Sequence, residues 1–332
     1  MTAYDFLIKL TPTQQVGGMF VLLFGLLLLA SLASFVLSLR DHPDDTTAEL
    51  QHRQQRNLQG ILRTSWTMMI VFWVAWMAGE WVALWLFGLV SFFALREFLT
   101  LSPTRRGDHR SLILAFFVVL PVQYWLVGAE HFDLFTVFIP VYVFLAIPVI
   151  SALADDPKGF LERNAKLQWG IMVCIYGMSH VPALLLLDFP GYDSKNAFLV
   201  FFLVIVVQLC VVVQHLTSQW FKWPPTAPHI STSFNWRSWL IAVFTAGLAG
   251  ALLFWITPFA VPAQSFAMAV IACSAGTLGH FVMKALKRDR GIPNWGGQIA
   301  SVTGAGGLLE RVDALCFAAP VFFHSVRWYF NL

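Results

Sequence analysis

The sequence predicts an all-α polytopic membrane protein with about ten transmembrane helices in one integral membrane domain, residues 1–332. Two compositional observations predict this: 58% of the 332 residues are hydrophobic and only 12% are charged, whereas soluble domains carry about a quarter charged residues. Third, the apolar runs are continuous, while the strands of a membrane barrel alternate apolar and polar positions. A freely soluble enzyme is excluded, and helices are expected to cross the bilayer.

Windows of about 19 residues locate the individual spans. The apolar run after the N-terminal segment is long enough to be a retained first helix. The polar stretch 40–63 is expected to be a cytoplasmic loop, either an amphipathic helix on the membrane surface or a solvated connector. The two runs that meet at Glu80 form either a tight helical hairpin or one long tilted helix. The expected spans are 17–38, 64–79, 80–96, 111–128, 133–152, 169–187, 195–216, 237–258, 264–284 and 312–330.

Lysine and arginine predict the orientation, because loops rich in these residues stay in the cytoplasm. With the N-terminus outside, fifteen basic residues fall in cytoplasmic loops, and only Lys9 and Lys195 lie on the other side. This bias favours an even number of spans and places both termini outside. The fifteen residues are Arg40, Arg53, Arg56, Arg63, Arg105, Arg106, Arg110, Lys158, Arg163, Lys166, Lys222, Lys287, Arg288, Arg290 and Arg311.

The cysteines and the net charge predict no further chemistry. All four cysteines lie inside apolar runs without metal-ligand spacing, so we expect them to be small packing residues. They are Cys174, Cys210, Cys273 and Cys316. The net charge is only +3, and the basic residues form no single stripe, so no nucleic-acid partner is expected.

The most unusual loop is the glycine-rich segment from Lys284 to Asp313. Glycine lets the backbone approach a ligand closely, and its N–H groups can line a phosphate. Basic side chains at both ends of the loop suit phosphate or anionic headgroups. Asp313 stands at the start of the last span, where an acidic residue is costly unless it has a role or a partner. The alternative is a helix cap at Asp313 beside a basic loop that touches anionic lipid.

Four histidines lie in or near the spans, where an ionisable residue is a functional candidate. Their other interpretation is a neutral ring hydrogen-bonded between helices. His280 stands out because Lys284 follows four residues later on the same helical face. We expect His280 to face the same cavity as Asp313. The other three are His180, His215 and His324.

The basic, glycine and acidic residues of this segment follow one another in the order Lys287-Arg288, Gly291, Gly304, Gly306-Gly307, Arg311 and Asp313, and an apolar tract at 318–323 comes next. In this order they resemble the C-terminal signature of the phosphatidate cytidylyltransferases, the CDP-diacylglycerol synthases. That signature reads Lys-Arg, Gly-x-Lys-Asp, Pro-Gly-His-Gly-Gly and Asp-Arg-x-Asp. The resemblance is clearest over residues 195–332, and the short bacterial paralogues are the most similar branch. It implies a multi-pass protein of a bacterial inner membrane.

The sequence departs from that signature at its acidic positions. The family's Lys-Asp pair is replaced by Pro293-Asn294, and the first Asp of Asp-Arg-x-Asp is Glu310. The family's His is Ala305, and its Gly-Asp ahead of Lys-Arg is Gly279-His280, with Lys284 in place of Ser. An asparagine keeps an oxygen ligand but loses the negative charge that a hard divalent cation prefers.

Departures also occur further upstream. Val211 occupies the place of an acidic residue one helix earlier. The family's Ser-Pro-x-Lys-Thr-x-Glu-Gly motif aligns with residues 231–238, where Phe234 replaces the Lys and Arg237 replaces the Glu.

The resemblance implies a reaction that joins CTP to phosphatidate and releases pyrophosphate with a divalent metal. The departures favour a protein that has lost catalysis and binds phospholipid or a partner protein of lipid metabolism. On that hypothesis no cofactor is expected, a homodimer is compatible with the sequence, and phosphate or lipid is bound by Lys287, Arg288, Arg311, Gly304, Gly306, Gly307, His280 and Lys284.

Two alternatives stay open. In a working cytidylyltransferase with rearranged ligands, Asp313, Glu310 and Asn294 would be the catalytic candidates and would hold magnesium. In a small transporter or channel subunit, broken helices paired between two related halves are expected. The sequence contains no such pairing.

Overall fold

The computed structural model describes residues 76–100, 105–189, 192, 196–292, 295 and 307–332, together with isolated positions of two earlier segments between residues 14 and 74. Every regular element within this part of the chain is helical. Six helical segments are long and apolar enough to cross a membrane. The chain is an all-α polytopic membrane protein. The total of ten spans stays a prediction, because the first two expected spans fall on residues described only in part.

A helix ends at Gly79, directly ahead of Glu80. Helix α4 runs Glu80–Thr100, and Gly79 before it has a φ of +89°. The Ala78 N–H donates to the Val74 carbonyl at 2.9 Å and closes the preceding helical turn. A residue in the left-handed region ends a helix. The apolar runs on either side of Glu80 are therefore separate helices, and the single long helix is excluded.

Each of the next three crossings contains a π-helical stretch. Such a stretch widens the helix locally and is frequent at bends and at functional sites. The first crossing consists of the 3-10 turn η1 (Arg106–Asp108), α5 (His109–Leu114), the π-helical η2 (Ala115–Val119) and α6 (Leu120–Gly128). The second consists of α7 (Phe132–Val137), the π-helical η3 (Phe138–Val143) and α8 (Phe144–Ala152). The third consists of α9 (Phe160–Gly170), the π-helical η4 (Ile171–Gly177), α10 (Met178–Ala183) and the 3-10 turn η5 (Leu184–Leu186).

The C-terminal helices are α11 (Asn196–Phe221), α12 (Trp236–Leu252), α13 (Pro262–Asp289) and α14 (Leu309–Phe330), with the short η6 (Phe254–Ile256) after α12. The side chain of Asn235 accepts the Arg237 N–H at 2.8 Å and caps α12. Helix α13 extends five residues beyond the predicted end of its span at 284. Lys287 and Arg288 therefore lie on its last turn and not in a loop, which corrects the sequence prediction.

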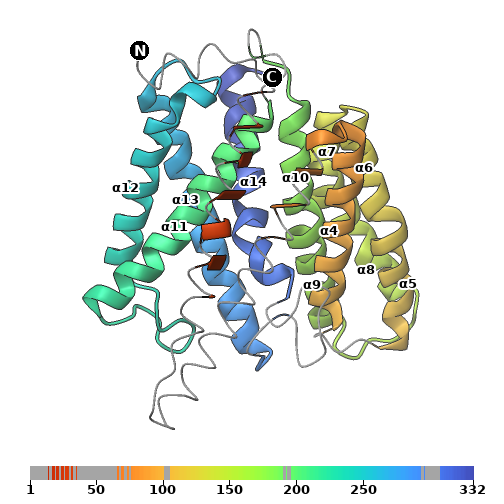
Figure 1. Cartoon of the computed structure of the whole chain (residues 1–332). Helices are drawn as coiled ribbons and strands as arrows, with labels where there is room; N and C mark the ends of the chain where they lie inside the picture. The colour runs from red at the N-terminus through yellow and green to blue at the C-terminus, as the bar shows by residue number, and fades with distance from the viewer. Residues whose placement is uncertain are drawn as a thin grey trace, which may run out of the picture.

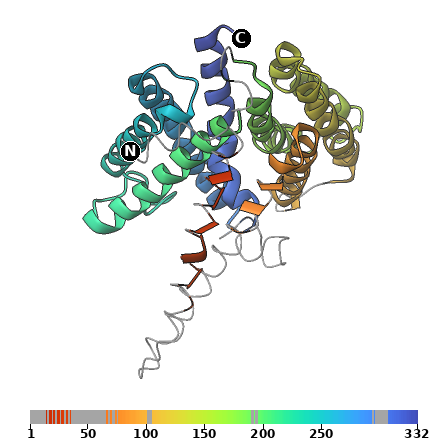
Figure 2. The same ribbon diagram turned by 45° about the horizontal axis from the view of Figure 1, so that its top comes forward.

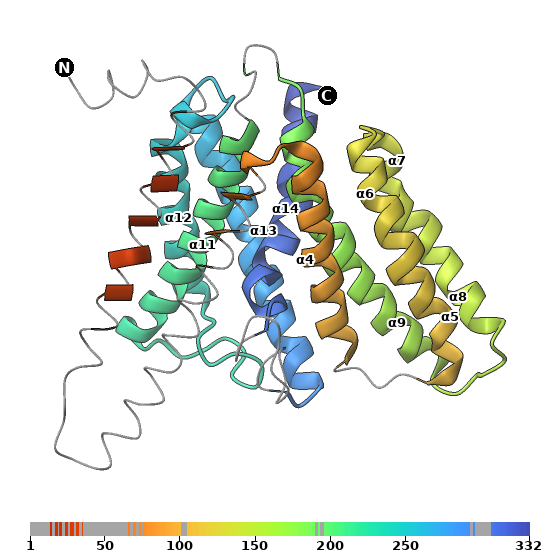
Figure 3. The same ribbon diagram turned by 45° about the vertical axis from the view of Figure 1, so that its right-hand side comes forward.

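Helix α14 occupies the centre of the bundle. It packs against α11 and α13 on one side and against η4 and α10 on the other, as Figure 1 shows. Figures 2 and 3 show α14 between a group made of α11 to α13 and a group that runs from α4 to α10. Two glycines let the backbones approach α14 closely. A Cβ at Gly177 would lie 2.2 Å from the Cys316 carbonyl oxygen, and one at Gly279 would lie 2.1 Å from the Phe317 ring.

The outer surface is apolar. Large side chains such as Trp85, Phe117, Leu145 and Leu240 are 60% or more exposed, far beyond what a soluble monomer shows over a continuous surface. The four cysteines are all free and buried, as predicted. The exposed apolar side chains supply the lipid-facing surface.

Candidate functional site

The candidate site lies where the end of α13 meets the start of α14. His280, Lys284 and Lys287 are spaced four and three residues apart, which puts them on one face of α13. Glu310 and Asp313, three residues apart, face them from the first turns of α14. The structure therefore brings together five of the residues that the sequence singled out. Asp313 lies at the start of the last helix as expected, and Glu310, which falls ahead of the predicted span, belongs to the same helix.

His280 and Asp313 form the inner pair of the site. His280 Nδ1 lies 2.8 Å from Asp313 Oδ2. The other carboxylate oxygen, Oδ1, accepts the backbone N–H of Ala314 at 2.6 Å. The Asp313 side chain is only 3% exposed. A buried carboxylate without a partner is strongly unfavourable, so His280 supplies the partner that the sequence argument required.

Lys287 and Glu310 form the outer pair. Lys287 Nζ makes an ion pair with Glu310 Oε1, and both side chains are largely buried. Glu310 Oε2 also accepts the backbone N–H of Trp295 at 3.3 Å. Lys287, which was predicted to bind phosphate, is therefore paired with a carboxylate of the protein itself.

Lys284 stands between the two pairs. It interacts electrostatically with Lys287, Asp313 and Glu310, yet no described carboxylate lies within 4 Å of its ammonium group. His215 of α11 interacts electrostatically with Lys284 and His280, and its Nε2 is hydrogen-bonded to Gln219 at 2.8 Å. Lys284 thus brings a positive charge without a close counter-charge among the described residues.

Glu97 of α4 holds the start of α14, and the sequence analysis missed it. Its two carboxylate oxygens accept the backbone N–H groups of Leu308 and Leu309, each at 2.9 Å. A helix N-terminus has unpaired N–H groups and a partial positive charge, which a carboxylate satisfies. The available signal was weak: a single acidic residue at the end of an apolar run.

The remaining predicted residues are dispersed. Arg288 is exposed, and the buried Arg311 Nε has no hydrogen-bond partner among the described residues. Gly307 has a φ of +71°, which suits glycine just ahead of α14. Asn294, Gly304 and Gly306 lie outside the described residues. His180 and His324 contact each other with ring centroids 5.3 Å apart, eleven residues further along α14 from Asp313.

Two positions of the upstream motif are used for packing. Phe234, where the resemblance places a lysine, is buried and stacks on Phe281 with ring centroids 4.3 Å apart. Arg237, where it places a glutamate, lies over the ring of Trp223 at 5.8 Å from the centroid. Among the described residues, neither side chain makes a polar contact with Asp313 or Glu310.

Comparison with known proteins establishes the family. Residues 59–329 match the family model described as the cytidylyltransferase family. The Escherichia coli (strain K12) protein named uncharacterized protein YnbB is 31% identical over 309 residues, which are 92% of this chain and 96% of that protein. The chain is a multi-pass membrane protein with the helices and site described above. It belongs to the cytidylyltransferase family, whose model includes phosphatidate cytidylyltransferase.

The family resemblance implies a divalent metal, and the two described carboxylates of this site are not arranged to hold one. Magnesium binds carboxylate oxygens that are free to face it. Here Asp313 is held by His280 and Glu310 by Lys287. Over the part of the chain that the structure describes, no group of three or more His, Cys, Asp or Glu residues is arranged to hold a metal.

Proposed function

We propose that this chain is a phosphatidate cytidylyltransferase-like membrane protein that has lost metal-assisted nucleotidyl transfer and has kept a phospholipid site where α13 meets α14. One observation supports this most directly: the pairing of Asp313 with His280 and of Glu310 with Lys287. A divalent ion would have to displace the His280 ring from Asp313 and the Lys287 ammonium group from Glu310 before it could bind. The site is thereby suited to anions and not to magnesium.

Lys284 supports the phospholipid part of the proposal. An ammonium group at the membrane end of a helix, without a close described counter-charge, is a suitable partner for a lipid phosphate. His280 precedes it by four residues on the same face of α13, and His215 of α11 interacts electrostatically with both residues. The positive-inside bias puts this end of the bundle on the cytoplasmic side of an inner membrane.

The loss of catalysis is tested with the purified protein, CTP, phosphatidate and magnesium. We expect no CDP-diacylglycerol above the background given by the Asp313→Ala variant. A catalytic metal supplies several kcal/mol of charge stabilisation in the transition state, and each 1.36 kcal/mol corresponds to about tenfold in rate. Robust turnover that Asp313→Ala abolishes would contradict the proposal and favour an active enzyme with Asp313, Glu310 and Asn294 as ligands.

A gain-of-function variant sharpens this test. Asn294→Asp restores one carboxylate of the family signature, and we expect it to stay inactive. His280, Phe234 and Arg237 would still stand where the family has an acid, a lysine and a glutamate. Activity of this single variant would show that the His280–Asp313 and Lys287–Glu310 pairs do not prevent metal binding.

The phospholipid site is tested separately. Lys284→Ala should lower the amount of anionic phospholipid that co-purifies in mild detergent, measured by mass spectrometry of the extracted lipid. The matched control is Lys222→Ala, which removes an exposed charge at the end of α11. An equal lipid content in the Lys284 variant and in the control would exclude a lipid phosphate at Lys284.

A further inference from the structure

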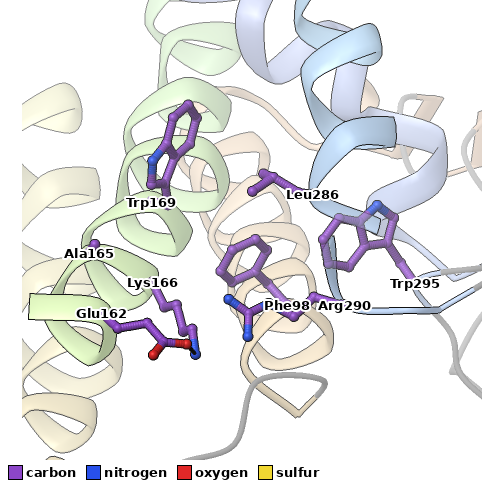
Figure 4. Close-up of a pocket in the computed structure, with 8 residues that line it drawn as sticks. All are labelled: Phe98, Glu162, Ala165, Lys166, Trp169, Leu286, Arg290 and Trp295. Carbon is purple, nitrogen blue, oxygen red and sulfur yellow. Dashed lines mark hydrogen bonds and ion pairs between the residues drawn. The ribbon is translucent and has the colours of Figure 1, made fainter. Parts of the chain in front are cut away.

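A pocket apart from the α13–α14 ion pairs lies between α4, α9 and α13. It encloses about 180 Å³ and is found where α4 and α13 end and α9 begins, which places it near a membrane surface (Figure 4). We call it the seam pocket, because α4 and α9 belong to one helix group and α13 to the other. Its lining residues are Phe98, Glu162, Ala165, Lys166, Trp169, Leu286, Arg290 and Trp295.

The walls of the seam pocket are apolar and aromatic. Phe98 stacks on Trp295 with ring centroids 5.3 Å apart and an interplanar angle of 25°. Leu286 and Trp169 continue this lining, and Trp169 is 42% exposed on the outside of the bundle. Tryptophan is enriched at the level of lipid headgroups, where one part of its ring is in hydrocarbon. The walls therefore suit the glycerol and first methylene groups of a lipid.

Two cations border the same pocket. Lys166 and Arg290 are 13% and 19% exposed, and their carboxylate partners Glu162 and Asp289 are 68% and 66% exposed. Figure 4 shows the Arg290 guanidinium close to the Lys166–Glu162 pair. Ion pairs with a solvent-exposed partner contribute little free energy. An incoming anion can therefore replace Glu162 at low cost, while the two cations have already lost most of their water.

We propose that the seam pocket binds the phosphate of an anionic phospholipid from the adjacent leaflet. Lys166 and Arg290 hold the phosphate, Trp169 and Leu286 contact the glycerol end of the acyl chains, and Glu162 is the internal anion that the phosphate replaces. The volume is below the roughly 300–1,000 Å³ of pockets that enclose drug-sized ligands, so it takes a headgroup and leaves the chains in the bilayer.

This site goes beyond the proposed function. None of its lining residues belongs to the Lys284 site, although the two are adjacent: the Trp295 ring lines the seam pocket and its backbone N–H donates to Glu310. A phospholipid in the pocket would touch the wall that also holds the Lys287–Glu310 pair.

The test is a lipid titration of the full-length protein in detergent, followed by native mass spectrometry. The probes are phosphatidylglycerol and, as the matched lipid without phosphate, diacylglycerol. We expect phosphatidylglycerol to bind and diacylglycerol not to. The double variant Lys166→Ala/Arg290→Ala should weaken phosphatidylglycerol binding about tenfold or more, as expected for the loss of charge-assisted hydrogen bonds to phosphate.

Glu162→Gln provides the sharper arm, because it removes the competing anion and should raise the affinity for phosphatidylglycerol. Lys158→Ala, which removes an exposed charge from the neighbouring loop, should change nothing. The charge-conserving variant Lys166→Arg should bind phosphatidylglycerol like the wild type. That result would attribute the weaker binding of the double variant to the lost charge and not to misfolding.

Three results would overturn the proposal. These are an unchanged affinity in the double variant, a lower affinity in Glu162→Gln, or displacement of the lipid by inorganic phosphate or CTP at equal concentration, which would assign the pocket to a soluble phosphate. Lys284→Ala should leave this binding intact. The proposal for the seam pocket and the proposal for the Lys284 site can thus be contradicted independently of each other.

Discussion

A histidine at position 280 replaces the aspartate that the resemblance places there, and this exchange changes the charge balance of the α13–α14 contact. Two carboxylates that face each other need a metal or a shared proton between them. An imidazole opposite Asp313 removes that need, because the side chains bond directly at 2.8 Å. Lys287, about two turns further along α13, and Glu310, about one turn earlier on α14, form a second such pair. The residues that depart from the family signature here thus belong to complementary pairs, and they are not unrelated losses of acidic ligands.

His280→Ala should destabilise the protein by about 3 kcal/mol or more, because removing one partner of a buried pair leaves the other charge uncompensated. The Asp313 carboxylate would keep only the Ala314 N–H. Asp313→Asn added to His280→Ala should recover part of this loss, since the amide carries no charge. Chemical denaturation in detergent micelles measures both effects.

The exposed His229 supplies the control for this cycle. His229→Ala should leave the free energy of unfolding unchanged within error. Strictly additive losses for the His280 and Asp313 substitutions would show that the two side chains are not energetically coupled, and the pair would then have no role in stability.

At the scale of elements, the packing of α14 depends on small residues in its neighbours. Gly279 of α13 and Gly177 of η4 let two backbones reach α14 from opposite sides. Close approach of this kind replaces the hydrophobic driving force that is missing between helices in lipid. The π-helical stretch of η4 ends at Gly177, which places the wide turn of that crossing against α14.

Gly177→Ala should lower the melting temperature, because its Cβ would lie 2.2 Å from the Cys316 carbonyl oxygen and the backbone must shift. Overpacking of this kind costs about 1–3 kcal/mol. Gly88→Ala in α4 is the matched control, since the nearest atom of Tyr124 would be 3.8 Å away. Equal melting temperatures for the two variants would mean that α14 can move away from η4 without loss.

The sequence predicted the helices that hydropathy alone defines, and it failed where contacts depend on distant segments. Spacing placed His280 and Lys284 on one face of a helix, because helical periodicity is local information, and Asp313 was expected in the same cavity because it begins the next span. Glu97 was missed because nothing in an apolar run identifies a partner at Leu308 and Leu309. Glu162 was not a candidate in the sequence, because an acidic residue in the first turn of a helix, as it is in α9, is ordinarily explained by the helix dipole.

At the scale of the whole molecule, the two helix groups meet along α14, and the candidate site and the seam pocket lie at the same end of this contact. The opposite end carries the C-terminus and the Arg327–Asp133 pair at 3.3 Å. Both polar sites therefore face one side of the membrane. From the positive-inside bias we expect that side to be the cytoplasm.

Orientation is testable with two reporters. A topology reporter fused after Leu332 should read out on the outside, and one inserted after Lys158 in the exposed loop ahead of α9 should read out in the cytoplasm. The reason is the excess of lysine and arginine in the alternate loops. Two reporters on the same side would contradict the map, and an inverted pair would reverse the assignment of both sites.

The contact of Glu97 with the start of α14 has a consequence for how the chain is made. A ribosome releases α4 more than two hundred residues before Leu308 and Leu309, and until then the Glu97 carboxylate lacks the two N–H groups that it accepts in the finished protein. A late helix therefore completes a contact for which an early helix supplies the acceptor. A chain truncated before α14 lacks both N–H donors, so the start of α14 and the end of α4 become tied together only late in synthesis.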